Sequence, residues 1–381
     1  MSYQVNDEIF SRLKFDNEKD RAFSSELKSK VTTYLKNQSN SSKGSALSIL
    51  KLIVLYSSFI MCWYQLAFLQ HSLLSTILIM AIFSLTYIAM AFTIGHDAGH
   101  NSMFKSQKIN NFVFWITYNL LGIPPYIWRF THNHIHHHYV NIPGHDIDIE
   151  KNPVLRLTPL ADFEFYHRYQ WIYALFLYPF FFFNKFFAND FRTYYGIEKR
   201  YFKNIKHPFY RSLEHVFFKL LYLSIMVGIP TLFSGYSFTQ VLLGYCAIMM
   251  TISFFIAFTL AGSHLNLDVS FIKPTKEGHV SISSMEHQII TCIDFHPESF
   301  ICGFICGGIN AHTAHHLFPS INSIHYPALT RIIRETCFTH GIAYKEKNIF
   351  SLWISHYKYL ILLSRDSKRQ EALLAAGLGQ K

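Results

Sequence analysis

Residues 52–96 read LIVLYSSFIMCWYQLAFLQHSLLSTILIMAIFSLTYIAMAFTIGH, and no Asp, Glu, Lys or Arg interrupts them. A helix needs about 20 apolar residues to cross a bilayer. The stretch is long enough for two crossings, and the polar triplet Gln70-His71-Ser72 offers a place for the chain to turn. This segment therefore predicts a helical hairpin in a membrane, with spans over about 50–69 and 73–95.

A second uncharged stretch lies between Lys219 and Asp268, and Ser234-Gly235-Tyr236-Ser237 divides it. It predicts a second hairpin, with spans over about 218–233 and 238–263. Two further apolar patches, 112–128 and 169–187, are broken by Gly or Pro and predict helices lying in the membrane interface, where aromatic rings are favourable. The predicted fold is all-α, with four spans in two hairpins and a cytosolic helical cap that holds a di-metal site.

The composition excludes several classes of protein. Hydrophobic residues make up 50% of the 381 residues and charged residues only 15%, which excludes intrinsic disorder. The six Cys are scattered and form no CxxC pair, so they indicate neither a zinc knuckle nor a disulfide framework. The formal charge of +10 is not gathered into a basic patch with a reader motif, so we expect no nucleic-acid partner.

Positive charge predicts the orientation. Both predicted hairpin turns lack Lys and Arg, whereas the N-terminal segment, residues 96–215 and the C-terminal tail are rich in them. Basic segments stay on the cytosolic side, so we expect both termini in the cytosol. The polar first 45 residues do not resemble a signal peptide. We expect a cytosolic segment over 1–45, one membrane domain over 46–360 and a tail over 361–381.

Histidine is unusually frequent, and ten of the 22 histidines fall in three short windows. The windows read His96-Asp97-Ala98-Gly99-His100, His132-Asn133-His134-Ile135-His136-His137-His138 and His312-Thr313-Ala314-His315-His316. On a helix, residues three or four apart share a face, so each window aims two or three imidazoles at one point. Imidazole is the commonest protein metal ligand and suits iron, zinc, copper or nickel.

Eight histidines fit this spacing, and His264 at the cytosolic end of the fourth predicted span is a ninth candidate. For His264, metal binding and a hydrogen-bonded buried histidine are equally good interpretations. Nine imidazoles exceed a tetrahedral zinc site and match two metals. The chain has no HExxH and no Cys beside the windows, which argues against a zinc protease and a sulfur-rich site. Two nitrogen-ligated irons in a membrane protein suggest oxygen chemistry on a lipid chain.

These windows resemble the three histidine boxes HxxxH, HxxxHH and (H/Q)xxHH of the membrane fatty acid desaturases, in particular bacterial proteins of the linoleoyl-CoA desaturase type. The flanks match as well: Asn141-Ile142-Pro143-Gly144-His145-Asp146-Ile147-Asp148 is similar to N-x-x-G-x-D-x-D, and Gly307-Gly308-Ile309-Asn310 and Leu317-Phe318-Pro319 surround the third box as in the family. The resemblance covers residues 46 to 360.

The resemblance implies a di-iron centre and a reaction that uses O2 and two electrons to place a double bond in a fatty acyl chain. An unactivated methylene has no acidic proton, so a cofactor must supply the difficult step. The implied iron ligands are His96, His100, His132, His136, His137, His264, His312, His315 and His316. Candidates to orient these imidazoles are Asp97, Asp146, Asp148, Asp268 and Asn310, and candidates to meet the substrate headgroup are Trp128 and Arg129.

Departures from the family pattern restrict this interpretation. Desaturases that insert between an existing double bond and the carboxyl usually have Gln where this chain has His312, which argues against that regiochemistry. No HPGG haem motif is present, so we expect a separate ferredoxin, or cytochrome b5 with its reductase, to deliver electrons. The acyl carrier, whether coenzyme A, acyl carrier protein or a lipid, stays open. We expect the cytoplasmic membrane in a bacterium and the endoplasmic reticulum in a eukaryote.

Two other functions fit part of the pattern. A hydroxylase acting on a lipid would use the same metal scaffold, and ligand spacing does not separate it from a desaturase. A non-enzymatic membrane protein that carries haem or a metal would place its polar ligands within the spans. Here the histidines gather at one end of the predicted spans instead, which argues against this class.

Overall fold

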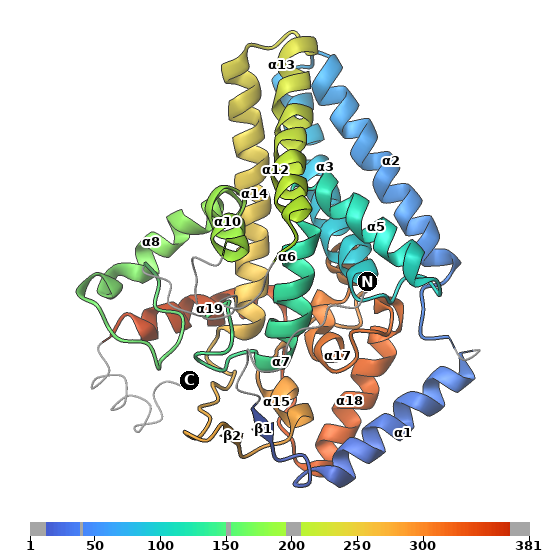
Figure 1. The fold of residues 1–381 in the computed structure, drawn as a ribbon, viewed down its shortest axis with the longest axis vertical. Helices are drawn as coiled ribbons and strands as arrows, with labels where there is room; N and C mark the ends of the chain where they lie inside the picture. Colours follow the sequence, from blue (N-terminus) through green and yellow to red (C-terminus); the bar gives the residue numbers. More distant parts are fainter. Residues whose placement is uncertain (1–12, 39–40, 150–153, 196–206, 366–381) are drawn as a thin grey trace.

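The structure is a computed structural model, and it describes residues 13–38, 41–149, 154–195 and 207–365. The chain is mostly helical, as predicted. Four long helices rise together on one side of a broader helical part that contains the three histidine windows (Figure 1). Residues 1–12 of the expected N-terminal segment and 366–381 of the expected tail lie outside the described residues.

The first predicted hairpin is formed by α2 (Ala46–Phe68) and α3 (Leu73–Ala89). Ser45 and Ser72 cap the two helices, because each side chain accepts a hydrogen bond from a backbone N–H of the first turn. Beyond α3 the helix continues through a π-helical segment, Met90–Gly95, into α4 (His96–Gly99). The first histidine window therefore stands at the end of a continuous apolar helix, Leu73–Gly99.

The second hairpin is formed by α12 (Phe209–Leu223), a π-helical segment Ser224–Gly228, α13 (Ile229–Phe233) and α14 (Phe238–His264). Ser237 and Gln240 form a capping box that starts α14. The helix α14 ends at His264, so this histidine lies at the same end of the bundle as the first window.

The turns of the two hairpins are bonded to each other. The Gln70 side chain donates to the carbonyl of Gly235 over 3.1 Å. The Tyr236 hydroxyl accepts from the backbone N–H of His71 over 2.9 Å and lies 3.2 Å from its carbonyl oxygen. Both turns therefore lie at the same end of the molecule, at the top of Figure 1, opposite the histidine windows.

A fifth helical stretch, Phe165–Tyr194, is also long and apolar enough to cross a membrane by length and composition. It corresponds to the patch 169–187 that we expected to lie in the interface. It is assembled from α8 (Gln170–Leu177), α9 (Phe181–Asn184) and α10 (Asp190–Tyr194), joined by 3₁₀- and π-helical turns. Pro179 lacks a backbone N–H and breaks the regular helix. In Figure 1, α8 points sideways from the four long helices.

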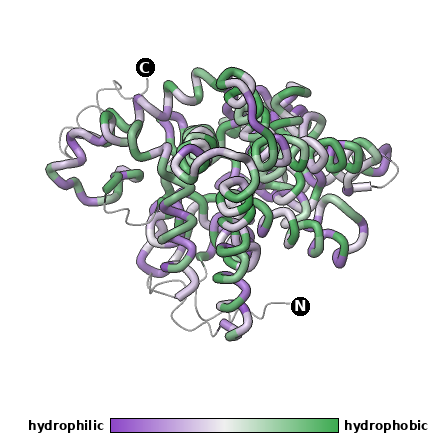
Figure 2. Tube along the Cα trace, turned by 90° about the horizontal axis from the view of Figure 1, so that it is seen from above, coloured by the Kyte–Doolittle hydropathy of each residue, from purple (hydrophilic) through white to green (hydrophobic). Residues whose placement is uncertain are grey.

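The broader part of the molecule contains shorter helices. They are α1 (Arg21–Asn37), α5 (Gln107–Leu120), α6 (Pro125–Arg129), α7 (His137–Tyr139), α15 (Ser284–Ile290), α16 (Phe300–Cys306), α17 (His312–Leu317), α18 (Tyr326–His340) and α19 (Ile349–Leu363). One hydrophobic cluster joins α2, α3, α5, α14 and α16, and a second joins α1, α17 and α18. When the molecule is viewed from above, hydrophobic residues predominate on the helices, and the hydrophilic stretches lie mostly toward the edges of the view (Figure 2).

The all-α prediction missed four strands of two residues each. Lys14–Phe15 (β1) pairs in parallel with His279–Val280 (β2), and Asp294–Phe295 (β3) pairs in parallel with Glu346–Lys347 (β4). Each pair joins segments that are far apart in the sequence. Strands this short leave no recognisable alternation of hydrophobic and polar residues, because that pattern needs at least four residues.

Candidate metal centre

The structure brings all nine predicted ligand histidines together. Eight of them form two groups of four, and within each group the ring nitrogens lie within 4.8 Å of one another. Cluster A contains His96, His100, His132 and His315, and cluster B contains His136, His264, His312 and His316. His137 lies between the clusters, in a third group with His315 and His316.

A π-helical segment decides how the second window divides. Residues Phe130–His136 continue α6 as a π-helix, in which residues five apart share a face. The Nε2 atoms of His132 and His137 are accordingly 3.2 Å apart, while His136 belongs to cluster B. The prediction that one window points at one site was therefore wrong for His132 and His136, because it assumed the α-helical period. It was also wrong for the third window, where His315 joins cluster A while His312 and His316 of the same α-helix join cluster B.

The inner nitrogens are close enough to share a small ion. In cluster A, the Nε2 atoms of His96 and His132 are 3.2 Å apart. In cluster B, those of His264 and His312 are 2.6 Å apart. Two neutral imidazoles can form one hydrogen bond with each other. Such a bond within a cluster would still leave the inner nitrogens of the other two histidines without a donor.

The outer nitrogens of cluster B fix the tautomer of each ring. The Nδ1 atom lies 3.0 Å from the Thr291 carbonyl in His264 and 3.1 Å from the Ile309 carbonyl in His312. In His316 it lies 2.9 Å from Gln288 Oε1, and in His136 it lies 3.1 Å from Asp148 Oδ2. All four partners only accept, so each Nδ1 carries a proton. In His264, His312 and His316 this leaves the Nε2 lone pair available to a metal.

Several buried imidazole nitrogens have no hydrogen-bond partner among the residues that the structure describes. They include Nε2 of His100 and His316 and both ring nitrogens of His315. Leaving a buried polar atom without a partner costs about 1–3 kcal/mol. A metal ion bound by these nitrogens would remove that cost, so the residues fit a metal site.

Burial keeps most of these rings neutral. It lowers the pKa of His100, His132, His137, His312, His315 and His316 well below the ordinary value of 6.5. His136 differs. Burial lowers its pKa, but the neighbouring carboxylates of Asp146 and Asp148 outweigh burial and raise the pKa to about 10. Metal ligands must be deprotonated, so only this histidine of the seven must lose a proton when a metal binds near neutral pH.

The five residues expected to orient the imidazoles fall into two groups. Asp148 forms an ion pair with His136 over 3.1 Å. Asp146 lies 3.7 Å from the same ring nitrogen and accepts from the backbone N–H of Asn141 and of Asp148. The other three have different partners. The Asp97 carboxylate accepts from Asn322 and Ser323, Asp268 pairs with Lys347, and Asn310 donates to the His296 carbonyl.

The two residues expected to meet the headgroup face inward. Trp128 stacks on His132 with ring centroids 4.3 Å apart, and its ring also contacts His96 and His100. The Arg129 guanidinium lies over the Phe114 ring, 4.3 Å from its centroid. Trp128 is thus a wall of cluster A.

Sequence reasoning missed two residues that hold the site. Gln288 bonds to His316 and also donates to the His137 carbonyl over 2.8 Å. Buried Asp294 accepts from the backbone N–H of Thr313, at the start of the third window, and from the Tyr344 hydroxyl. The hydrogen bonds of Gln288 depend on how α15 (Ser284–Ile290) packs against the second window, which the sequence spacing does not show.

Comparison with known proteins agrees with this arrangement. A family model described as "Fatty acid desaturase" matches residues 70–348. The sn-1 linoleoyl-lipid 6-desaturase of Synechocystis sp. is 29% identical over 358 residues, which cover 93% of this chain and 99% of that protein. The sn-1 linoleoyl-lipid 6-desaturase of Arthrospira platensis is 28% identical, over 90% of this chain and 92% of that protein.

A moss relative extends the similarity beyond cyanobacteria. The acyl-lipid (8-3)-desaturase of Physcomitrium patens is 28% identical over 84% of this chain and 66% of its own length. The family match spans most of the chain and includes His137 and every histidine of the two clusters. The chain is therefore a member of the fatty acid desaturase family and an oxidoreductase.

Proposed function

We propose that the protein introduces a double bond into a fatty acyl chain, using O2 and two electrons, at a centre of two irons held by the nine histidines. The observation that carries the proposal is the pair of buried four-histidine clusters joined by His137. Two bound irons would supply the activation of O2 that an unactivated methylene requires. The protein's own groups hold the ligands in one tautomer, keep them dry and position the acyl chain.

We further propose that the acyl chain is carried on a lipid. The names of the two cyanobacterial relatives describe lipid-linked linoleoyl chains as their substrates, and these relatives match nearly the full length of this chain. A separate ferredoxin or cytochrome b5 would deliver the electrons. The desaturase domain would extend over 46–360, with 1–45 and 361–381 as cytosolic flanks.

We propose that four helices cross the membrane: α2, α3 with its extension, α12 with α13, and α14. Support comes from the two bonded turns, which lie opposite the histidines and lack Lys and Arg. The stretch Phe165–Tyr194 would lie along the cytosolic interface, since its α8 points away from the other helices and Pro179 breaks it.

The fatty acid profile of a host that expresses the protein tests the proposed function. Gas chromatography–mass spectrometry, with derivatives that locate double bonds, should find a new unsaturated acid that is absent when His316→Ala is expressed at the same level. A new hydroxy acid would contradict desaturation. Two indications of the double-bond position disagree: His312 argues against insertion toward the carboxyl, whereas the relatives are named 6-desaturases. The same experiment measures that position.

A further inference from the structure

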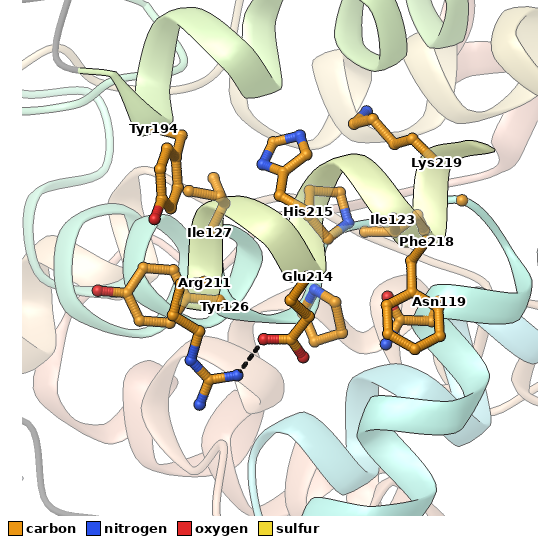
Figure 3. Close-up of a pocket in the computed structure, with 13 residues that line it drawn as sticks. Asn119, Ile123, Tyr126, Ile127, Tyr194, Arg211, Glu214, His215, Phe218 and Lys219 are labelled. Carbon is orange, nitrogen blue, oxygen red and sulfur yellow. Dashed lines mark hydrogen bonds and ion pairs between the residues drawn. The ribbon is translucent and has the colours of Figure 1, made fainter. Parts of the chain in front are cut away.

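The pocket in Figure 3, between α6 and the first turns of α12, leaves little room for a ligand. Its cavity volume is about 20 Å³, which is enough for about one water molecule. The cations that line it are already paired, Arg211 with Glu214 and Lys219 with Asp190. The buried turn at residues 141–148 instead contacts two of the segments that carry ligands of cluster B.

Asn141, the first residue of this turn, has a backbone conformation that side chains rarely adopt. Its φ is +55°, in the left-handed region, and its side chain is 0% exposed. Asn tolerates this region better than most residues, although glycine occupies it at no steric cost. The side-chain oxygen Oδ1 is also buried without a hydrogen-bond partner in the described part of the chain. Two unfavourable features at one residue indicate that its side chain has a role beyond forming the turn.

The backbone of Asn141 supports the carboxylates that lie beside His136. Its N–H donates to Asp146 Oδ2 over 2.8 Å. The other oxygen of Asp146 accepts from the backbone N–H of Asp148 over 3.0 Å. The Asp148 carboxylate in turn lies 3.1 Å from Nδ1 of His136. The turn therefore holds both carboxylates at the outer nitrogen of one cluster B ligand.

The side chain of Asn141 holds a second ligand of the same cluster. Its amide Nδ2 donates to the carbonyl of His264 over 2.7 Å and lies 3.4 Å from the carbonyl of Ser270. His264 is the last residue of α14, where the carbonyls have no partner within the helix. Asn141 therefore bonds the end of a proposed span to the turn that follows the second window.

One residue thus connects two ligands that come from different parts of the chain. The rings of His136 and His264 are 4.9 Å apart between centroids, and both belong to cluster B. A metal site requires its ligands within about 0.5 Å of the binding geometry, so a displaced end of α14 would weaken cluster B. None of the four cluster A histidines lies on α14.

We propose that Asn141 is a positioning residue, which sets the spacing of His136 and His264 and thereby the affinity of cluster B for its metal. The inference rests on the proposed function, because it takes the two clusters as metal sites. Removal of the Asn141 amide should therefore weaken metal binding at cluster B and leave cluster A unchanged.

Metal titration of the full-length protein in detergent tests the proposal without requiring turnover. The chelator-treated protein is titrated with Co²⁺, which nitrogen ligands bind more tightly than Fe²⁺, and the visible absorption of bound Co²⁺ measures the occupancy. His100→Ala weakens cluster A, so that the tighter remaining site is cluster B, and His312→Ala does the reverse. Adding Asn141→Gly should lower the Co²⁺ affinity about 10–100-fold in the His100→Ala protein and by less than about twofold in the His312→Ala protein.

Glycine is the substitution that isolates the amide. Asn141→Gly keeps the left-handed backbone and the N–H that bonds to Asp146, and it removes only the side chain. Asn141→Asp is a second variant of nearly the same shape. It places a carboxylate oxygen against the His264 carbonyl, so it should weaken cluster B at least as much.

The matched control is Asn101→Gly. Asn101 is also left-handed, with a φ of +57°, and it follows His100 of cluster A in the chain. In the His100→Ala protein, this control should leave the Co²⁺ affinity of cluster B unchanged.

The two backgrounds separate positioning from a general loss of stability. The proposal is wrong if Asn141→Gly or Asn141→Asp lowers the affinity equally in both backgrounds, or if a folded variant keeps the full affinity of cluster B. Either result would leave the proposed function intact, provided that the wild type binds two Co²⁺ per chain. A wild-type protein that binds no Co²⁺ would refute both the proposed metal centre and the role of Asn141.

Discussion

At the scale of single residues, the orientation of the imidazoles depends on their outer nitrogens. The Nδ1 of His316 donates to Gln288, whose amide also donates to the carbonyl of His137 in the second window. Partners of this kind set the basicity and direction of a metal ligand, and losing one typically costs 10–100-fold in metal affinity. Gln288 therefore joins two of the three windows through hydrogen bonds that the sequence spacing does not show.

We predict that Gln288→Leu weakens iron binding about 10–100-fold, because His316 loses the acceptor that fixes its tautomer. Competition with a calibrated chelator measures the affinity. The matched control is Gln170→Leu, which removes a buried glutamine that bonds to the backbone of Arg156 and Leu360, away from the histidines. The control should lower thermal stability and leave iron affinity unchanged. Equal iron affinities in the two variants would contradict the role of Gln288.

A second residue-scale prediction concerns Asp294. Burial raises the pKa of this carboxyl from 3.8 to about 6, although hydrogen bonds from Thr313 and Tyr344 oppose the shift. A folded-state pKa above the unfolded value means that the contribution of this carboxyl to stability is fully present below pH 3.8 and is lost as pH rises through 6. The shift of about two units corresponds to about 3 kcal/mol at 1.36 kcal/mol per unit.

Asp294→Asn should remove this pH dependence. The amide oxygen still accepts from Thr313, and the amide nitrogen can donate to the Tyr344 oxygen. Thermal unfolding of the two proteins in the same detergent, at pH 4.5 and pH 7.5, measures the effect. The variant should gain stability relative to the wild type as pH rises. Parallel changes in the two midpoints would show that Asp294 does not titrate in this range.

The sequence was sufficient to choose the candidate histidines, because these residues lie in the three windows or at the end of a predicted span. The histidine spacing gave eight candidate ligands, the place of His264 at the end of a predicted span gave the ninth, and all nine side chains meet in the structure. The aspartates were harder, because a carboxylate bonds to whatever the fold places beside it. Asp97 adjoins His96 in the chain, yet its carboxylate bonds to Asn322 and Ser323.

At the scale of secondary-structure elements, π-helical segments position two of the windows. Met90–Gly95 precedes His96, and Phe130–His136 contains most of the second window. The sequence predicted helices at both places. It assigned His132 and His136 to one site, however, because it assumed the period of an α-helix and not that of a π-helix. From the sequence, the patch 169–187 was also expected to be too short or too broken to span, whereas Phe165–Tyr194 is long and apolar enough by length and composition, because Pro179 breaks the regular helix without ending the helical stretch.

Gly307 holds the first of these π-helical segments in place. Its φ is +54°, and a Cβ there would meet the Phe92 carbonyl oxygen and approach Thr93 Cγ2 to 2.5 Å. We predict that Gly307→Ala destabilises the protein and lowers its iron content, because the displaced segment leads directly into His96. Thermal unfolding and iron per chain measure the two effects.

The control for this prediction is Gly341→Ala. Gly341 also has a positive φ, +68°, but a Cβ at this position would meet no other atom within 4 Å among the described residues. The variant should lose only the roughly 1–2 kcal/mol of stability that a Cβ costs in the left-handed conformation, and it should keep its iron. If the two alanine variants lost equal stability and iron, close packing at Gly307 would not be what positions the first window.

At the scale of the whole molecule, the two hairpins separate the turns from the metal centre. We predict that an impermeant maleimide added outside right-side-out vesicles labels Leu73→Cys, beside the first turn, where Leu73 is 77% exposed. Lys105→Cys, just after the first window and also exposed, should react only after the membrane is opened. Wild-type vesicles give the background from the native cysteines. The reverse pattern would invert the proposed topology.

The central claim is that nine imidazoles hold two irons, and metal analysis of the purified protein tests it most directly. Elemental mass spectrometry should find about two irons per chain, as expected for two clusters of nitrogen ligands. His100→Ala and His264→Ala, one in each cluster, should each reduce that number. Wild-type protein that is folded and holds zinc, or no metal, after expression with ample iron would contradict the account.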